Sequence, residues 1–491
     1  MFGTASDVGK SVVTAALCRI YADRGLRVAP FKAQNMSNNS GVTPEGLEMG
    51  RAQIVQAEAA RIVPHVDMNP VLLKPVSDIG AQVVVMGKSW TDASAKAYDS
   101  RKPFLFAQAC AALDRLRATS DLVILEGAGS CAEVNLLKRD IVNLPMAEYA
   151  GAPILLVADI HRGGVFAQVV GTLACLDEVQ RQPIRGIIIN RFRGDADLFA
   201  EGSEWIARRT GLPVLGVLPW FDHFQIADED AVPIERPEAR PPVHRNRPSI
   251  GVIRLPHLSN FDEFDPLAHI EGLNLLFLER PCDLTPFRAV ILPGTKNTRG
   301  DLHWLDITGW TERLKSYFRQ GGNLLGICGG YQLLGLWVHD PDGIEGPAGS
   351  SAGLGLLPVT TTLKHPKRTT RTVFCWEGDC GLGYEIHMGR TDRSDAAALF
   401  AITARNQAGC TDADGCCSAD GRVLGTYIHG MFDTPEITRR WLARIGLAAL
   451  NVNGLHGTAA RDRAYDLLAA HVRRHLDLAA IDRMIGLPAA V

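Results

Sequence analysis

Residues 324–335 read LLGICGGYQLLG, and this stretch decides the fold of the half of the chain that contains it. An apolar run passes through Gly326-Ile-Cys328-Gly329-Gly330 straight into a segment of good helix formers. Small residues on both sides of Cys328 allow a sharp strand-to-helix turn, the nucleophile elbow, which presents one side chain. A cysteine that only fills a hydrophobic core needs no such turn. The stretch therefore predicts an α/β domain with Cys328 as its nucleophile.

The surroundings of Cys328 offer groups that stabilise a thiolate and an oxyanion. A helix N-terminus lowers the pKa of a thiol, and the N–H of Gly329 faces the place where an oxyanion develops. A second apolar strand, Ala289–Leu292, runs into a Pro-Gly-Thr turn at Gly294. We therefore expect Gly294 and Gly329 to form the oxyanion hole.

A nucleophilic cysteine also needs a base, and His429 is the favoured candidate. It ends the apolar strand Val423–Ile428 and is followed by Gly430, as expected for a residue presented at the end of a strand. Such partners meet in the fold and need not be neighbours in sequence. His387 is the rival base, but it lies two residues after Glu385, which can simply pair with it.

The N-terminal stretch Gly3–Ser11 reads GTASDVGKS and predicts a phosphate-binding loop in front of a helix. Gly9 lets the backbone curl so that its N–H groups face phosphate oxygens at the positive end of that helix. Lys10 is expected to reach the β- and γ-phosphates, and Ser11 to offer a hydroxyl to Mg²⁺. Thr4 occupies the position at which such loops usually begin with glycine.

A phosphate-binding loop normally follows a buried strand, but only Met1 and Phe2 precede Gly3. Loss of the strand would remove a central element of the sheet. The pattern therefore favours a natural start upstream of Met1, and it predicts that the chain as given folds poorly or binds ATP weakly.

Three later apolar strands end in the polar residues Glu126, Asp159 and Asn190. The carboxyl ends of parallel strands meet at one edge of the sheet, where open α/β folds bind ligands. We expect Glu126 to hold Mg²⁺ or a substrate group, and Asn190 to hydrogen-bond the nucleotide base.

The chain divides at the proline-rich segment 233–248, in which neither a helix nor a strand is expected. Residues 1–232 are assigned to a P-loop domain, residues 249–440 to a second α/β domain, and residues 441–491 to a helical tail. Alternating strands and helices in both halves predict parallel sheets covered by helices. Thr411–Gly421 is expected to be a solvated polar loop. The expected strands are Arg27–Phe31, Val83–Met86, Leu122–Leu125, Ile154–Ala158, Ile184–Ile189, Ile250–Arg254, Ala289–Leu292, Leu324–Ile327 and Val423–Ile428.

Composition narrows the class of protein. The 491 residues carry a net charge of −3, so no electrostatic pattern favours nucleic acid or an anionic membrane as a partner. We find no signal peptide and no apolar run of membrane-spanning length. Eleven cysteines spread along a long chain fit a reducing cytoplasm better than a disulfide framework. The expectation is a cytoplasmic protein with small-molecule partners; homo-oligomerisation is left open.

The pattern G-x-C-G-G-x-Q-L-L-G with a downstream strand-end histidine resembles the class I glutamine amidotransferases, which have a flavodoxin-like α/β fold. Most members follow the histidine with Pro and Glu, and the Glu orients the imidazole. Gly430 and Met431 stand there in this chain. That departure resembles the cobyrinic and cobyric acid synthase branch, and it leaves the orienting group open, with a backbone carbonyl or a carboxylate such as Asp433 or Glu385 as candidates.

The N-terminal half is similar to the same branch. GTASDVGKS resembles the ATP loop of dethiobiotin synthetase and its corrin-amidating relatives. The segments Val28–Ser40 (VAPFKAQNMSNNS) and Asp67–Pro75 (DMNPVLLKP) resemble the cobyric acid synthase family specifically. The resemblance runs from residue 2 to about residue 480.

The resemblance implies an ATP- and Mg²⁺-dependent ligase of cobalamin biosynthesis. Its reaction is the amidation of the b, d, e and g carboxylates of (adenosyl)cobyrinic acid a,c-diamide, with glutamine or ammonia as the nitrogen source. It also implies that Cys328 forms a glutamyl thioester, that His429 moves the protons, and that the released ammonia passes between the domains to an acyl phosphate.

Three other classes fit less well. A partition-type ATPase carries an extra lysine just after the first loop glycine, where this chain has Thr4 and Ala5. CTP synthase would show a His-Pro-Glu ending, which we do not find. A binding protein with a degenerate amidotransferase domain would be expected to have lost the cysteine, yet Cys328 is present.

Overall fold

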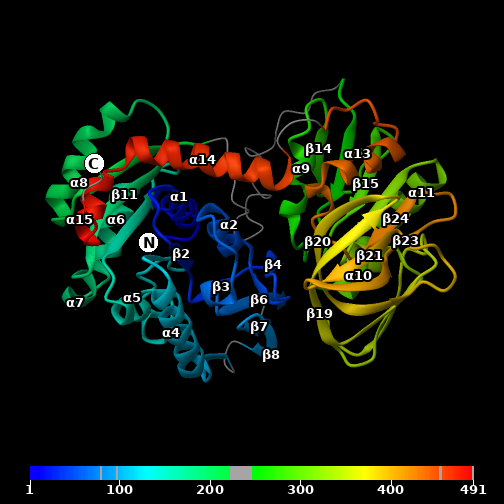
Figure 1. The fold of residues 1–491 in the computed structure, drawn as a ribbon, viewed down its shortest axis with the longest axis horizontal. Helices are drawn as coiled ribbons and strands as arrows, with labels where there is room; N and C mark the ends of the chain where they lie inside the picture. Colours follow the sequence, from blue (N-terminus) through cyan, green and yellow to red (C-terminus); the bar gives the residue numbers. More distant parts are fainter. Residues whose placement is uncertain (78–79, 95–97, 222–245, 453–455, 489–491) are drawn as a thin grey trace.

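The computed structural model describes residues 1–491 except 78–79, 95–97, 222–245, 453–455 and 489–491. Two α/β halves lie side by side, and the helix α14 (Gly457–His475) runs from the second half back across the first (Figure 1). Most of the proline-rich segment 233–248 lies outside the described residues. None of the helices in the described part of the chain is long and apolar enough to cross a membrane.

Parallel strands form the centre of the first half. One sheet has the order β1-β10-β11-β12, and β2 and β9 form a separate parallel pair. Every residue of β10 is buried, as expected for a strand covered on both faces. The strands are β1 (Phe2–Gly3), β2 (Val28–Phe31), β9 (Leu122–Leu125), β10 (Ile154–Asp159), β11 (Ile184–Phe192) and β12 (Val214–Pro219). The helices are α1 (Lys10–Asp23), α2 (Arg51–Ala59), α4 (Lys102–Thr119), α5 (Leu144–Ala150), α6 (Val165–Ala174), α7 (Glu178–Arg181) and α8 (Ala200–Thr210).

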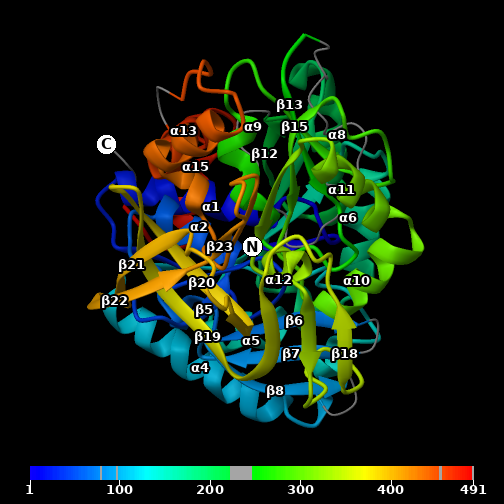
Figure 2. The ribbon, with the colours of Figure 1, turned by 90° about the vertical axis from the view of Figure 1, so that its right-hand side faces the viewer.

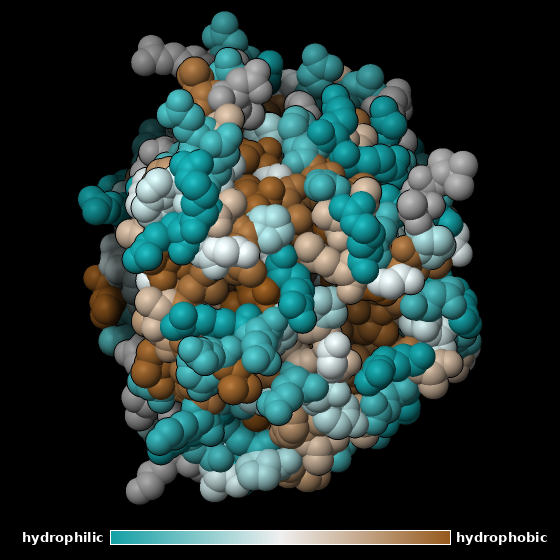
Figure 3. All heavy atoms as spheres, turned by 90° about the vertical axis from the view of Figure 1, so that its left-hand side faces the viewer, coloured by the Kyte–Doolittle hydropathy of each residue, from teal (hydrophilic) through white to brown (hydrophobic). Residues whose placement is uncertain are grey.

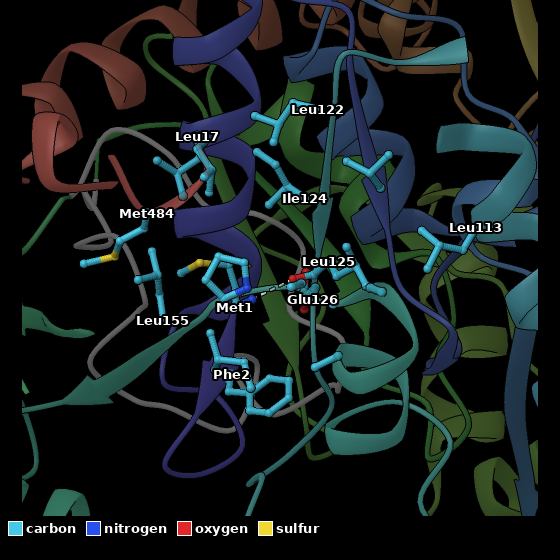
Figure 4. Close-up of a pocket in the computed structure, with 18 of the residues that line it drawn as sticks. Met1, Phe2, Leu17, Leu113, Leu122, Ile124, Leu125, Glu126, Leu155 and Met484 are labelled. Carbon is cyan, nitrogen blue, oxygen red and sulfur yellow. Dashed lines mark hydrogen bonds between the residues drawn. The ribbon is translucent and has the colours of Figure 1, made fainter. Parts of the chain in front are cut away.

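The strand before the phosphate-binding loop is present but only two residues long. β1 lies between β9 and β10: it pairs with β10, and the Met1 ammonium donates to the Leu125 carbonyl at 2.7 Å. Beyond Met1 the two longer strands face a cavity of about 510 Å³, lined by side chains such as Leu122, Ile124 and Leu155 (Figure 4). Burial lowers the pKa of the Met1 ammonium to about 6.

A mixed sheet in the order β3-β6-β7-β8 completes the first half. The expected strand Val83–Met86 corresponds to β7, but β7 runs antiparallel to both neighbours and belongs to neither parallel sheet, so its assignment to a parallel sheet was wrong. The strands are β3 (Gln34–Met36), β6 (Val71–Ser77), β7 (Gly80–Val85) and β8 (Lys88–Ser94). A short antiparallel hairpin, β4 (Ser40–Val42) and β5 (Glu48–Gly50), projects toward the second half.

The second half contains a sheet in the order β14-β13-β15-β16-β24-β23, parallel except for β23 at its edge. Its strands are β13 (Ser249–Ile253), β14 (Asn274–Leu278), β15 (Phe287–Leu292), β16 (Asn323–Ile327), β23 (Cys416–Cys417) and β24 (Val423–Thr426). The associated helices are α9 (Asp265–Ala268), α10 (Thr298–Ile307), α11 (Trp310–Arg319), α12 (Gly329–Leu334) and α13 (Pro435–Arg444).

A second sheet, built on the long strands β19 (Thr360–Trp376) and β20 (Asp379–Asp392), lies beside the first (Figure 2). Its other strands are β17 (Trp337–Asp340), β18 (Gly349–Ala352), β21 (Phe400–Arg405) and β22 (Ala408–Asp414). Thr411–Gly421 is therefore not a plain loop, because β22 and β23 occupy much of it. Cys375 and Cys380 form a disulfide where β19 turns into β20.

The helical tail returns to the first half of the molecule. α14 packs along α1, and α15 (Leu478–Met484) brings the buried Asp482 to the Tyr21 hydroxyl at 2.9 Å. The outer face of this half is largely polar, with apolar atoms showing in the hollows between polar side chains (Figure 3). The tail thus completes the hydrophobic core of the domain that begins the chain.

Candidate active sites

The Cys328 elbow forms as the sequence predicts. β16 ends at Ile327, α12 starts at Gly329, and Cys328 between them has φ 54° and ψ −111°. A non-glycine residue adopts such a backbone conformation only where the surrounding structure enforces it. A Cβ added to Gly330 would lie 1.9 Å from the Leu292 carbonyl oxygen, so the elbow packs directly on the end of β15. The glycine there is required by close backbone approach.

Three neighbouring parallel strands, β15, β16 and β24, bring the predicted groups together. The Cys328 thiol donates to the Ile386 carbonyl at 3.4 Å and interacts electrostatically with the His429 imidazole, and both side chains are buried. A Cβ on Gly294 would be 3.2 Å from His429 Cε1, and one on Gly329 would be 2.9 Å from the Thr295 nitrogen. Both candidate oxyanion donors thus lie at the Cys328–His429 pair.

The carboxylate that contacts the histidine is Glu263, which the sequence analysis missed. Its Oε2 lies 3.1 Å from His429 Nδ1, and both side chains are buried. Glu263 belongs to the short 3₁₀ helix η6 (Phe261–Phe264), in the connection that follows β13. Its position after a strand end, in the run Asn260-Phe-Asp-Glu-Phe, was the available signal, because strand ends at this edge converge on the elbow.

The two carboxylates proposed earlier are used elsewhere. Asp433 pairs with Arg461 at 2.8 Å. Glu385 accepts from Arg405 at 2.8 Å and from two threonine hydroxyls. Neither is the group on His429 Nδ1, so both assignments were wrong.

Electrostatics favour a protonated His429. Burial lowers the pKa of the imidazole, but the Glu263 carboxylate and then Cys328 raise it more, to about 10. Burial raises the pKa of the Glu263 carboxyl itself. Tyr384 stacks on the imidazole with ring centroids 5.1 Å apart. A protonated imidazole beside the cysteine can give its proton to a leaving amine.

His387, the rival base, is held by other groups. Its ring stacks on Tyr427 with centroids 3.6 Å apart, and its Nδ1 lies 2.8 Å from the Gly389 carbonyl oxygen. Burial lowers its pKa. The structure therefore favours His429 as the partner of the thiol.

The phosphate-binding loop is folded, and nearby carbonyl groups bind its lysine. α1 begins at Lys10 behind Gly9, whose φ of 93° favours glycine. The Lys10 ammonium donates to the carbonyls of Ala5 at 3.1 Å and Gly129 at 2.9 Å. These carbonyls hold the ammonium inside the loop, where phosphate oxygens would compete for it. α1 ends at Asp23, and Gly25, two residues later, adopts φ 86°.

Asn190 supports this loop instead of projecting into open space. Its Nδ2 donates to the Val8 carbonyl at 2.9 Å, and a Cβ on Gly9 would lie 2.1 Å from that nitrogen. Thr4 Oγ1 lies 3.4 Å from Gln168 Oε1, a long contact. The expected contact of Asn190 with a nucleotide base stays a prediction, because its amide hydrogen-bonds the loop here.

Glu126 lies at the centre of a buried polar cluster beside the loop. Its Oε1 accepts from Ser11 Oγ at 2.7 Å and from Lys32 Nζ at 3.0 Å, while Gln56 of α2 donates to its Oε2. Burial raises the pKa of the carboxyl, but Lys32 and these hydrogen bonds lower it more, to below its usual value. Glu126 is therefore a carboxylate. Asp159, the other acidic strand end, pairs with Arg191 at 3.0 Å.

The two halves match known domain families. Residues 1–234 match the CobQ/CobB/MinD/ParA nucleotide binding domain, and residues 249–437 match the CobB/CobQ-like glutamine amidotransferase domain. Cobyric acid synthase of Chlorobium phaeobacteroides is 50% identical over 494 residues, covering 99% of this chain and 97% of that protein. Cobyric acid synthase of Chlorobaculum tepidum is 50% identical with the same coverage. That of Chloroflexus aurantiacus is 47% identical and covers 98% of each chain. The elbow, the phosphate-binding loop and these full-length matches together show that the chain belongs to the cobyric acid synthase family of glutamine-hydrolysing amide ligases.

Proposed function

We propose that this chain amidates the b, d, e and g carboxylates of (adenosyl)cobyrinic acid a,c-diamide at the expense of ATP and glutamine. The observation that carries the proposal is the buried set of Cys328, His429 and Glu263 at a strained elbow, fused to a folded phosphate-binding loop. The names of its relatives support the substrate. We further propose that it acts in the cytoplasm on these small molecules.

In the glutaminase half, the Cys328 thiolate attacks the side-chain amide carbon of glutamine. The N–H groups of Gly294 and Gly329 stabilise the oxyanion, and the His429 imidazolium gives its proton to the departing ammonia. The neutral imidazole then takes a proton from water, which hydrolyses the glutamyl thioester to glutamate and restores the thiolate pair. Glu263 keeps the imidazole oriented throughout.

In the nucleotide-binding half, a corrin carboxylate oxygen attacks the γ-phosphorus of ATP and ADP leaves. Ammonia then attacks the acyl phosphate carbon, phosphate leaves, and the amide remains. Lys10 offsets the charge that develops on the phosphoryl oxygens. Ser11 Oγ lies 2.7 Å from Glu126 Oε1, and both are oxygen atoms of the kind that Mg²⁺ prefers. Together with nucleotide phosphates, these two side chains would hold the ion. Bound Mg²⁺ would neutralise phosphate charge.

Two variants test the division of labour. Cys328→Ala should abolish amidation driven by glutamine and retain amidation driven by free ammonia, because the nucleotide-binding half is intact. Lys10→Ala should lose amidation with either nitrogen source and keep basal release of glutamate. The readouts are amidated corrin and glutamate, each measured with and without ATP. Glutamine-driven amidation that survives in Cys328→Ala, or ATP-driven amidation that survives in Lys10→Ala, would contradict the proposal.

A further inference from the structure

Hydrogen bonds from the nucleotide-binding half hold the turn that carries Glu263. Asn39 Oδ1 accepts from the Asn260 backbone N–H at 2.8 Å, and the Ser40 N–H donates to Asn260 Oδ1 at 3.0 Å. This reciprocal pair is buried on both sides. Asn260 itself has φ 55°, so its backbone is held in a conformation that few residues adopt readily. The contact fixes the start of the turn three positions before Glu263.

A second contact fixes the same turn one position before Glu263. Arg51 Nε donates to Asp262 Oδ2 at 2.7 Å, with both side chains largely shielded from solvent. Arg51 is the first residue of α2 and follows directly on β5, so it belongs to the nucleotide-binding half. Guanidinium–carboxylate pairs of this kind are directional and hold geometry well.

The turn is also continuous with the oxyanion hole. The Ser259 N–H donates to the Gly294 carbonyl at 2.9 Å. Displacement of residues 259–263 would therefore move both the carboxylate on His429 and the backbone of a candidate oxyanion donor. The geometry of the glutaminase centre depends on contacts that the glutaminase half does not make by itself.

The helix that carries Arg51 reaches the other active site as well. Gln56, five residues further along α2, donates to Glu126 Oε2, while Ser11 of the phosphate-binding loop donates to Glu126 Oε1. One nine-residue helix thus contacts the phosphate site through Gln56 and the glutaminase turn through Arg51. A packed helix moves as a rigid element, so a shift at one contact is felt at the other.

We propose that Arg51 is a positioning residue for the glutaminase centre, and that α2 transmits the state of the phosphate site to the turn carrying Glu263. The proposal rests on the glutaminase and ATP-binding functions proposed above. When Ser11 and Glu126 engage a nucleotide, Gln56 and α2 adjust, and Arg51 sets the Glu263 turn for proton transfer by His429. Glutamine hydrolysis is thereby linked to the presence of a nucleotide that can use the ammonia.

The test compares Arg51→Gln, Arg51→Lys and Asp262→Asn with the unmodified chain. Arg51→Gln and Asp262→Asn should each lower glutamine-driven kcat, by up to about 100-fold as for a misplaced catalytic group. Ammonia-driven amidation should stay unchanged, and Arg51→Lys should restore part of the loss. Because both variants break the Arg51–Asp262 contact and Arg51 also pairs with Glu58 at 3.9 Å, the double variant should be no worse than Arg51→Gln alone. The alkaline limb of the glutaminase pH profile should move to lower pH, since Glu263 no longer holds the proton on His429 as firmly.

Arg24→Gln is the matched control, because it breaks an arginine–aspartate pair of 2.9 Å between the nucleotide-binding half and the tail, away from the turn. It should leave the ratio of glutamine-driven to ammonia-driven activity unchanged. An equal loss of glutamine-driven and ammonia-driven activity in Arg51→Gln, or an unchanged pH profile, would show that Arg51 only joins the two halves and does not position the glutaminase centre. In the unmodified chain, addition of ATP and Mg²⁺ should raise glutamate release, and Arg51→Gln should remove that increase. Absence of any increase in the unmodified chain overturns transmission through α2, whereas absence of glutamate release altogether overturns the proposed function instead.

Discussion

At the scale of single residues, the glutaminase centre depends on a charge balance that is visible in the structure. His429 is buried between Cys328 and Glu263, and its pKa is raised to about 10 although burial lowers it. Removal of the Glu263 charge would leave burial as the dominant influence on the pKa of the imidazole. The ring would also lose the Glu263 carboxylate, its side-chain acceptor at Nδ1 among the described residues.

Glu263→Gln should therefore lower the pKa of His429 and the rate of glutamine hydrolysis. The pKa of the folded imidazole lies above its ordinary value because of the carboxylate, so loss of that charge moves the alkaline limb of kcat/KM to lower pH. The expected loss in kcat is about 10²- to 10⁴-fold, by analogy with replacement of the acid in a serine triad. Glutamate release measured from pH 6 to 10 provides the test. Glu385→Gln, at a buried carboxylate that pairs with Arg405, is the control and should keep the profile.

The two histidines give a second test. His429→Ala should lose glutamine-driven activity, because its imidazole interacts with Cys328 and is paired with Glu263. His387→Ala should keep most of it, since that ring stacks on Tyr427 and bonds the Gly389 carbonyl. The reverse result, with His387→Ala inactive and His429→Ala active, would show that His387 is the base and that the assignment to His429 is wrong.

At the scale of secondary structure, the elbow and the first strand are the two elements with unusual geometry. Gly330 at the start of α12 has no room for a side chain, because a Cβ would meet the Leu292 carbonyl at 1.9 Å. Backbone cannot move aside as a flexible side chain does. The strand–elbow–helix unit is thus fixed by a close contact between β15 and α12.

Gly330→Ala should open that contact, displace Cys328 and abolish glutamine-driven activity, while ammonia-driven amidation continues in the other half. Gly409→Ala is the control, since a Cβ there meets nothing within 4 Å. Thermal unfolding and the two amidation assays together provide the readout. Retention of full glutamine-driven activity in Gly330→Ala would mean that the close approach does not set the position of the thiol.

The cavity beside β1 predicts a stabilising extension. Five β-branched residues added before Met1 would lie between β9 and β10, bury apolar surface and remove a buried ammonium. Each kcal/mol gained should raise Tm by about 2–4 °C.

The pH dependence of stability has a definite sign. The pKa of the Met1 ammonium falls from 8.0 to about 6 on folding, so the unfolded chain binds more protons and stability rises between pH 6 and 8. The extended protein should lose that rise. A glycine–serine extension of equal length is the control and should not raise Tm.

At the scale of the whole molecule, the chain closes on itself. The tail that follows the amidotransferase half packs on the nucleotide-binding half, where Asp482 accepts from Tyr21 and pairs with Arg24 at 2.9 Å. These contacts join residues more than four hundred positions apart. The halves are thus held together by the tail as well as by the contacts around Asn260.

Asp482→Ala should destabilise the nucleotide-binding half, because it leaves a buried hydroxyl and a partly buried guanidinium unpaired. The expected cost is about 3–5 kcal/mol, as for loss of one partner of a buried pair. Thermal unfolding should show a lower Tm, with basal glutamate release retained below that temperature. Asp477→Ala, at an exposed helix cap of α15, is the control and should cost only ~1 kcal/mol. An unchanged Tm in Asp482→Ala would exclude the tail as part of the first core.

The sequence by itself determined the parts of the sites that are built from neighbouring residues. A glycine-flanked cysteine between an apolar strand and a helix predicts the elbow, and Gly9-Lys10-Ser11 before a helix predicts the phosphate-binding loop, because each geometry is set by local backbone sterics. Most of the central parallel strands could be found for the same reason, since each is a continuous apolar run, but β12 and β14 were missed. The strand-end position of His429 was sufficient to place it beside the thiol.

Only the tertiary structure decided which distant groups meet. Glu263 lies 166 positions from His429, and its place after a strand end does not by itself select it over Asp433 or Glu385. Two other contacts also join segments separated by hundreds of residues: the Arg51–Asp262 pair and the packing of α14 on α1. The physical reason is that such pairings are chosen by the packing of whole sheets and helices, which no short window of sequence contains.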